Sequence, residues 1–163
     1  MTSYETSQEK GFREFSLNYI PILHDELRTA REEIMTLRNW IRETGPRTFE
    51  GHSSGVTSVC QVSNTTFLSA SNDRTIKLMD ITTGECLKTF GGHSNKVNFV
   101  CQMSDTTFLS GSDDNTIKLW DITTGECVKI FEGHSLGVNS ICQVSDTTFL
   151  SGSDDYTIKL WLI

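Results

Sequence analysis

The chain repeats itself every 41 residues. A Gly-His dipeptide recurs at residues 51–52, 92–93 and 133–134. The second copy (92–132) matches the first (51–91) at 28 of 41 positions, and the third (133–163) matches the second at 24 of 31. A fixed period near 40 residues is typical of repeat arrays, in which each copy forms one unit that packs against its neighbours. The period therefore limits the fold more strongly than any single motif does.

Each copy contains short segments of β-forming residues separated by turn-forming clusters. In the first copy the expected strands read VTSVCQV (56–62), TFLSAS (66–71), TIKLMDI (75–81) and CLKTF (86–90). The clusters SNT, NDR and TTGE lie between them, and such residues favour turns. Four strands in 41 residues is the size of one β-propeller blade.

The Gly-His dipeptide, the sequences SGSDD and TIKLWD, and the 41-residue period together resemble WD40 repeats. The resemblance covers residues 47–163. It implies a mainly β fold, a partial WD40 β-propeller of three four-stranded antiparallel blades, preceded here by an N-terminal α-helix. The implied repeats are 51–91, 92–132 and 133–163.

The resemblance also implies a structural tetrad in each blade, in which His, a strand Ser, Asp and Trp are joined by hydrogen bonds. In the first copy Met79 replaces the Trp and has no N–H to donate, so we expect a weaker first blade. Ser112 and Ser153 are competing choices for the serine. The implied members are His52, Ser69 and Asp73, then His93, Ser110, Asp114 and Trp120, then His134, Ser151, Asp155 and Trp161.

Ser, His and Asp also form the catalytic triad of many hydrolases. We favour the structural interpretation, because a scaffold element recurs with every repeat whereas an active site has no need of three copies. The structural interpretation also explains the Trp. We therefore expect no catalytic residues, no metal site and no cofactor. The cysteines recur at repeat positions without a CxxC pair, which argues against zinc.

Three blades are fewer than the four to eight of closed propellers. The sequence RTFE (47–50) aligns with the last expected strand of the first two copies, and the third copy stops before such a strand. We therefore expect 47–50 to form an extra outer strand. One prediction is a homodimer that completes a six-bladed ring. The alternative is that the chain is a truncated fragment of a larger WD40 signalling or ubiquitin-ligase adaptor that acts through its helix.

Apolar residues recur with steps of four and three between residues 18 and 45, which predicts an amphipathic helix and is compatible with a coiled coil. Glu26 and Glu33 would face Arg31 and Arg38 of a parallel partner. The other interpretation is a helix that lies on the propeller or on another protein. Residues 1–17 are expected to be a disordered or weakly structured tail. The proposed self-association residues are Leu23, Leu27, Ala30, Ile34, Leu37 and Ile41.

The formal net charge is −7, and there is no Lys/Arg cluster. This argues against nucleic acid and against an anionic membrane surface as partners. There are five cysteines and no secretory signal, which favours a reducing compartment, either the cytoplasm or the nucleus.

The three copies differ mainly in the residues after Gly-His, before the TIKL segment and in the first strand. The resemblance implies that these positions lie on the top face of a WD40 propeller. We therefore expect a non-catalytic scaffold that binds a protein or peptide there; the alternative is neutral drift of exposed positions. The top-face candidates are Ser54, Arg74, Asn95, Lys96, Phe99, Asn115, Leu136 and Tyr156. A hydrolase is the weakest of the functions considered.

Overall fold

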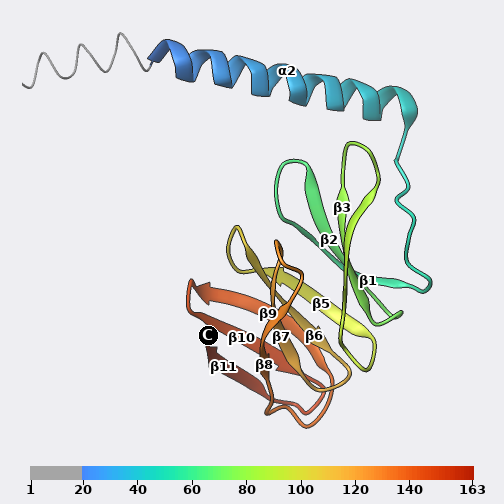
Figure 1. Cartoon of the computed structure of the whole chain (residues 1–163), viewed down its shortest axis with the longest axis vertical. Coiled ribbons are helices and arrows are strands. Elements are labelled where there is room, and N and C mark those ends of the chain that lie inside the picture. The colour runs from blue at the N-terminus through green and yellow to red at the C-terminus, as the bar shows by residue number, and fades with distance from the viewer. Residues whose placement is uncertain (1–19) are drawn as a thin grey trace, which may run out of the picture. The chain divides into compact units, whose positions relative to one another are not determined.

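The computed structural model describes residues 20–163 (Figure 1). Residues 49–163 form one compact unit, and helix α2 (Ile20–Thr44) belongs to another. The helix ends at Thr44, and Gly45 follows with a φ of 75°, which is typical of the residue after a helix C-terminus. The predicted tail, 1–17, lies outside the described residues, and so do the side chains of Leu23, Leu37 and Ile41.

The compact unit consists of three antiparallel sheets, which confirms the prediction of a mainly β fold with an N-terminal helix. In each sheet the strands are neighbours in chain order. The first sheet contains β1 (Val56–Gln61), β2 (Thr66–Ser71), β3 (Thr75–Asp80) and β4 (Cys86–Gly91). The second contains β5 (Val97–Gln102), β6 (Thr107–Ser112), β7 (Ile117–Asp121) and β8 (Cys127–Phe131). The third contains β9 (Val138–Ser145), β10 (Thr148–Ser153) and β11 (Ile158–Leu162).

The turn clusters close the hairpins as their residue types suggest. Between β3 and β4, Gly84 has φ of 81°, and its N–H donates to the Asp80 carbonyl at 2.9 Å. The Asp80 carboxylate accepts the N–H groups of Thr82 and Thr83, both at 2.7 Å. Short polar side chains that bond nearby backbone in this way stabilise turns.

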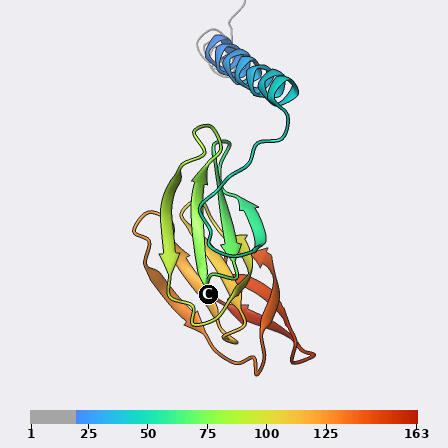
Figure 2. The ribbon, with the colours of Figure 1, turned by 90° about the vertical axis from the view of Figure 1, so that its right-hand side faces the viewer.

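The sheets pack face to face around their first strands, because β1 contacts β5 and β5 contacts β9 (Figure 2). Two apolar clusters fill the spaces between them. Leu68 and Ile76 of the first sheet pack against Val97 and Trp120 of the second. A second cluster joins the second and third sheets in the same way. The side chains of the second sheet thus contribute to both clusters, one on each face of the sheet.

The prediction of a strand at 47–50 is wrong for the single chain, since these residues have no strand structure. Phe49 nevertheless packs edge-to-face on Phe67, with ring centroids 5.0 Å apart. This repeats the contact of Phe90 with Phe108 at 4.9 Å.

Candidate functional site

The tetrad candidates of the second sheet form a continuous chain of hydrogen bonds. His93 Nδ1 lies 2.7 Å from the Asp114 carboxylate, and His93 Nε2 lies 2.7 Å from Ser110 Oγ. Trp120 Nε1 donates to the same Ser110 Oγ at 2.8 Å. The network fits a neutral imidazole that donates from Nδ1 and accepts the serine hydroxyl proton at Nε2. Ser110 therefore both donates and accepts.

The third sheet repeats this geometry, with His134–Asp155, His134–Ser151 and Trp161–Ser151 contacts all at 2.7 Å. The competing serines have another role. Ser112 Oγ donates to the Lys96 carbonyl at 2.8 Å, and Ser153 Oγ donates to the Leu136 carbonyl at 3.0 Å.

The first sheet keeps only part of the chain. His52 bonds Asp73 and Ser69, both at 2.8 Å, but Met79 supplies no donor to Ser69. A hollow of about 180 Å³ lies on this face and borders His52, Ser69 and Met79. The replacement of Trp by Met thus removes one hydrogen bond and leaves space beside the remaining residues.

A threonine that the sequence reasoning missed completes each network. Thr116 donates its hydroxyl to Asp114 at 2.6 Å and its backbone N–H at 3.0 Å, and Thr75 and Thr157 do the same for Asp73 and Asp155. The signal was present in the sequence, because a threonine follows two residues after the aspartate in every copy.

These bonds hold the three aspartates in the charged form. Burial raises the pKa of Asp114, but hydrogen bonds from His93, Thr116 and the Ser94 N–H outweigh it, so the net pKa lies well below the ordinary value. The pKa of Asp73 is lowered by the same balance. For Asp155 the leading influence is the Thr157 hydroxyl, which lowers the pKa.

The Ser–His–Asp order resembles a hydrolase triad, but the serine is inaccessible in two sheets. Ser110 is fully buried, and Ser151 is nearly so. The Trp120 ring also lies against the Gly-His turn, where a Cβ on Gly92 would stand 3.2 Å from the ring. A nucleophile needs room for its substrate, and these two serines have none. Burial also raises the pKa of the Cys101 thiol, which disfavours the thiolate.

The top-face candidates lie in two sets of loops at the same end of the sheets. Within each sheet the loop before the first strand is bonded to the turn between the second and third strands. Asn72 N–H donates to the Gly55 carbonyl at 2.9 Å, and Asp113 N–H donates to the Lys96 carbonyl at 3.1 Å. Asn115 Nδ2 also donates to the Ser135 carbonyl of the next sheet at 3.2 Å. The loops of the second and third sheets are therefore joined by a hydrogen bond.

Three candidates on this surface have a left-handed backbone. Arg74, Asn115 and Tyr156 have φ of 72°, 70° and 66°. Asn adopts this conformation readily, whereas bulky residues rarely do. Arg74 is exposed, and Tyr156 is 100% exposed. The structure thus presents two large side chains at a position where Gly or Asn costs less.

The remaining candidates divide between exposed and buried positions. Ser54, Asn95 and Leu136 are exposed, and Lys96 forms an ion pair with Asp113 at 3.3 Å. Phe99, one of the top-face candidates, is half-buried and packs against the cluster between the second and third sheets. Its ring thus contributes to the packing of the sheets, a role that the pattern of variation did not indicate.

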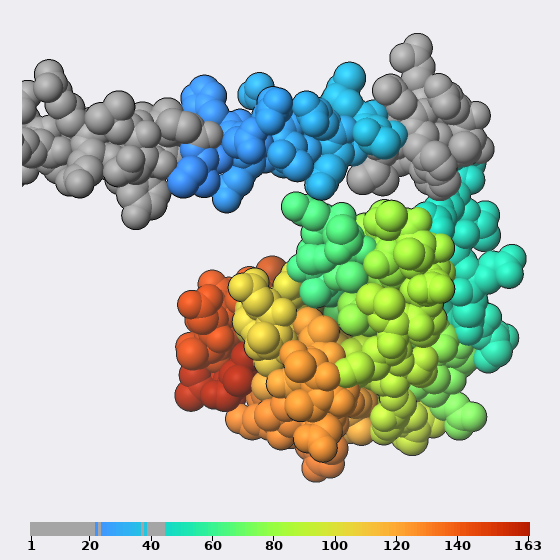
Figure 3. All heavy atoms as spheres, turned by 45° about the horizontal axis from the view of Figure 1, so that its top comes forward, coloured from blue at the N-terminus to red at the C-terminus, as the bar shows by residue number. Residues whose placement is uncertain are grey.

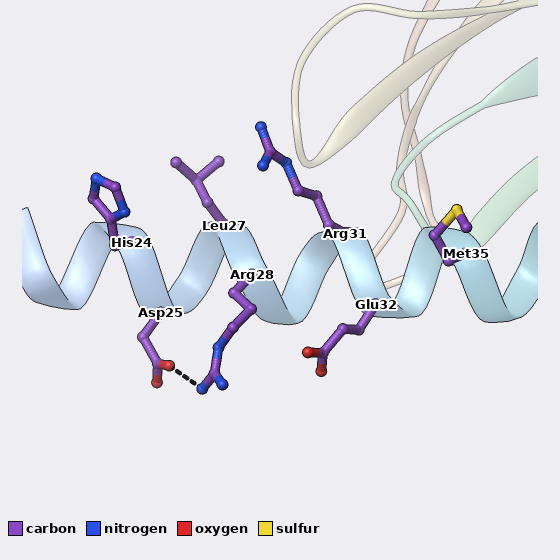
Figure 4. Close-up of a pocket in the computed structure, with 7 residues that line it drawn as sticks. All are labelled: His24, Asp25, Leu27, Arg28, Arg31, Glu32 and Met35. Carbon is purple, nitrogen blue, oxygen red and sulfur yellow. Dashed lines mark hydrogen bonds and ion pairs between the residues drawn. The ribbon is translucent and has the colours of Figure 1, made fainter.

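On helix α2, those self-association residues whose side chains the structure describes are exposed; they would form the seam of a coiled coil. Leu27 and Ile34 are at least half exposed, and Ala30 is exposed as well. Figure 4 shows Leu27 and Met35 on one side of the helix and Asp25, paired with Arg28, on the other. The space between these side chains is lined by α2 residues alone.

Comparison with known proteins identifies the class. The family described as "WD domain, G-beta repeat" matches residues 45–80, 84–121 and 125–161. The chain therefore belongs to the WD40 family, and its sheets are blades of a WD40 β-propeller, as the sequence predicted. No curated protein sequence matches the chain significantly.

Among solved structures, the chain resembles the "WD40 beta propeller domain of Doa1", with a TM-score of 0.66 and 33% identity. The match covers 70% of this chain and 39% of that one. The chain thus spans well under half of the propeller structure that it matches. WD40 propellers in general bind protein partners and are non-catalytic.

No cluster of potential metal ligands occurs among the residues that the structure describes. All five cysteines are unpaired thiols. In the described part of the chain, no helix has the length and apolar character needed to cross a membrane.

Proposed function

We propose that the chain is a non-catalytic WD40 scaffold that binds a protein or peptide on its top face and assembles through helix α2. The observation that carries the proposal is the left-handed backbone of Arg74 and Tyr156. Such strain costs about 1–3 kcal/mol, and strained residues concentrate at functional sites. Arg and Tyr are also the residues that dominate binding hot spots.

The charge of the repeats favours a basic partner. Residues 51–163 carry 7 basic and 12 acidic side chains, a net charge of −5. Complementary charge mainly raises the association rate and selects among partners. The unpaired cysteines favour a reducing compartment, so we propose the cytoplasm, or the nucleus, as the location.

Glycine substitutions at Arg74 and Tyr156 remove the side chains proposed to bind while changing the stability of the fold little. Peptides are selected from a displayed random library on the wild-type chain, and their Kd values are measured for Tyr156→Gly and Arg74→Gly. We expect each variant to weaken binding about tenfold or more. Stability should stay within about 1 kcal/mol of wild type, because the relief of strain offsets the flexibility of glycine.

Two variants serve as controls. One is Asn115→Gly, at the equivalent position of the second blade, and the other is Val128→Ala, on the distant strand β8. Both should leave the affinity for peptides that depend on Arg74 and Tyr156 within about twofold of wild type. Selected peptides that bind both glycine variants as tightly as wild type would show that the top face is not the binding surface.

Assembly through α2 is supported by the exposed Leu27 and Ile34, which lie seven residues apart, as on a coiled-coil seam. Light scattering on the wild-type chain should give twice the mass of 18.3 kDa. Leu27→Asp with Ile34→Asp should lower the affinity between copies by at least about tenfold. Thr29→Asp, outside the seam, is the control. A double variant that dimerises as tightly as wild type would exclude the helix from the contact.

The alternative is that these repeats belong to a larger WD40 adaptor, in signalling or in a ubiquitin ligase, which acts through its helix. The partial coverage of the Doa1 propeller, 39%, favours this alternative. The intact mass of the protein isolated from its source would decide between them. A mass of 18.3 kDa would contradict the alternative.

A further inference from the structure

Three aromatic rings surround the tryptophan of a complete tetrad. In the second blade the Trp120 ring is stacked on Phe108, with ring centroids 6.1 Å apart and 12° between the planes. It meets Phe90 edge-to-face at 6.0 Å and His93 edge-to-face at 6.1 Å. The third blade repeats this arrangement around Trp161. The indole of each complete tetrad therefore lies among two phenylalanines and the tetrad histidine.

The first blade keeps these rings although Met79 takes the place of the tryptophan. Phe49 and Phe67 have ring centroids 5.0 Å apart and 79° between their planes. The equivalent pair of the second blade, Phe90 and Phe108, has 4.9 Å and 81°. The histidine of the first blade is held by its aspartate and its serine, as in the other blades. The rings thus keep the arrangement that accommodates an indole elsewhere in the chain.

The hollow of about 180 Å³ lies where these rings meet the incomplete tetrad. Its lining includes Phe49, Phe67, His52, Ser69 and Met79. The Gly-His turn shows the same difference between blades. A Cβ on Gly92 would stand 3.2 Å from the tryptophan ring, and one on Gly133 would stand 3.1 Å from it. At Gly51 the nearest atom would be in the Lys77 side chain, at 3.7 Å. Space that the indole fills in two blades is therefore open in the first.

The first blade also keeps the oxygen that accepts the indole N–H. In the second blade Ser110 Oγ receives the Trp120 N–H at 2.8 Å and bonds His93 Nε2. Ser69 Oγ bonds His52 Nε2 at 2.8 Å, and among the described residues no second group donates to it. Ser69 is 5% exposed. A buried acceptor of this kind is stabilised by a donor.

The other polar groups of the hollow favour a ligand without net charge. Lys77 and Glu50 both line it and have opposite charges. The Lys77 ammonium donates to Thr89 Oγ1 at 2.9 Å. An ordered water needs about two to four polar partners, whereas most of this lining is aromatic or aliphatic. A flat aromatic molecule with a single N–H matches the rings and the serine together.

We propose that the hollow of the first blade binds an uncharged aromatic ligand of the indole class. The ligand ring lies among Phe49, Phe67 and His52, and its N–H donates to Ser69 Oγ. The ligand thus takes the position that the tetrad tryptophan has in the other two blades. Met79 is flexible, so its side chain can adjust to the ring. The proposal does not depend on the proposed scaffold function.

Nuclear magnetic resonance of the full chain, with isotope-labelled methionine methyl groups, locates the ligand. Indole is the probe, and the Met79 methyl signal should shift with a Kd of about 1 mM or tighter. The methyl signals of Met35, on helix α2, and of Met103, in the cluster between the second and third sheets, are internal references that should not shift. In Figure 3 the first sheet (green) and the third sheet (red) lie at opposite ends of the compact unit, so a shift confined to Met79 places the ligand in the first blade. A Met79 signal that does not move up to about 10 mM indole would overturn the proposal.

Met79→Trp fills the hollow with an indole from the chain itself. This variant should lose indole binding, and its midpoint of thermal unfolding should rise by about 3 °C or more, because the ring and its N–H are restored. Met35→Trp, at a position 54% exposed on α2, is the matched control and should bind indole as the wild type does. A folded Met79→Trp chain with an unchanged Kd for indole would place the ligand elsewhere and refute the site.

Indene tests the hydrogen bond, because it has the shape of indole without the N–H. The preference of the wild type for indole over indene, taken as the ratio of the two Kd values, should fall at least about threefold in Ser69→Ala. A general loss of affinity in the variant cancels in this ratio. Ser54→Ala, in an exposed loop, should keep the ratio of the wild type. If Ser69→Ala keeps that ratio as well, the serine does not read the N–H and the proposed binding mode is wrong.

A blocked tryptophan distinguishes the two sources of an indole. N-acetyltryptophanamide has the same ring on a peptide backbone. A Kd within about threefold of that of indole supports the site and assigns the ring to the side chain of a peptide. A Kd at least about tenfold weaker supports the site and assigns the ring to a small molecule. Peptide binding on the top face should be the same with and without saturating indole, so the failure of either proposal leaves the other standing.

Discussion

At the residue scale, the tetrad serine of the second blade is bonded to two buried side chains. Ser110 receives the Trp120 N–H and bonds His93 Nε2, and all three side chains are buried. Buried polar groups are costly unless they are hydrogen-bonded. No described buried side-chain N or O atom lacks a partner. The three-residue pattern that suggests catalysis in the sequence thus satisfies the polar interior of a blade.

Ser110→Ala should therefore lower the free energy of unfolding by about 2 kcal/mol or more, because His93 and Trp120 both lose their common partner. Urea unfolding followed by tryptophan fluorescence measures the loss. Ser135→Ala, in an exposed loop, should change it by less than about 0.5 kcal/mol. A Ser110→Ala variant as stable as wild type would argue that the hydroxyl is not structural and would reopen the hydrolase hypothesis.

At the element scale, identical strand sequences have different surroundings. The segment IKL lies in the third strand of every blade, yet Ile117 is fully buried and Ile158 is exposed. The difference comes from the third blade, which covers β7, whereas no blade among the described residues covers β11. The outer strands show a related effect, because their outward side chains, such as Val128, stay exposed.

Ile117→Ala should consequently lower the free energy of unfolding by about 2–5 kcal/mol, through lost burial and the cavity that remains. Val128→Ala should change it by less than about 0.5 kcal/mol, although it too removes an apolar side chain from a strand of the same blade. Urea unfolding of the two variants makes the comparison. Similar losses for both would mean that the packing between the second and third blades does not stabilise the fold.

At the scale of the whole molecule, three aspartates of the same kind link folding to pH. Asp73, Asp114 and Asp155 lie in successive blades, and the pKa of each is lowered in the folded chain. The unfolded chain takes up their protons near the ordinary pKa of about 3.9. Below that pH the unfolded state binds more protons than the folded state, so acid destabilises the fold.

The free energy of unfolding should therefore be constant with respect to these aspartates above about pH 5 and should fall as the pH drops below about 4. Urea titrations at a series of pH values measure the slope. Thr116→Val removes one hydrogen bond that lowers the pKa of Asp114 and should make the slope shallower. A stability that does not change between pH 4.5 and about pH 2.5 would contradict this linkage.

The sequence by itself determined the repeat unit, the residues of the tetrad and the helix, because these depend on local patterns. The 41-residue period predicts which strands pair within a blade, and a donor or acceptor at a fixed repeat position has the equivalent partner in each copy that keeps that residue. Only the tertiary structure decided which equivalent residues are covered. Ile117 and Ile158 have the same sequence neighbours, and Phe99 was predicted to lie on the top face yet packs between blades. Residues 47–50 have the sequence of a strand and no strand structure, since burial and strand pairing depend on what lies beside a segment in space.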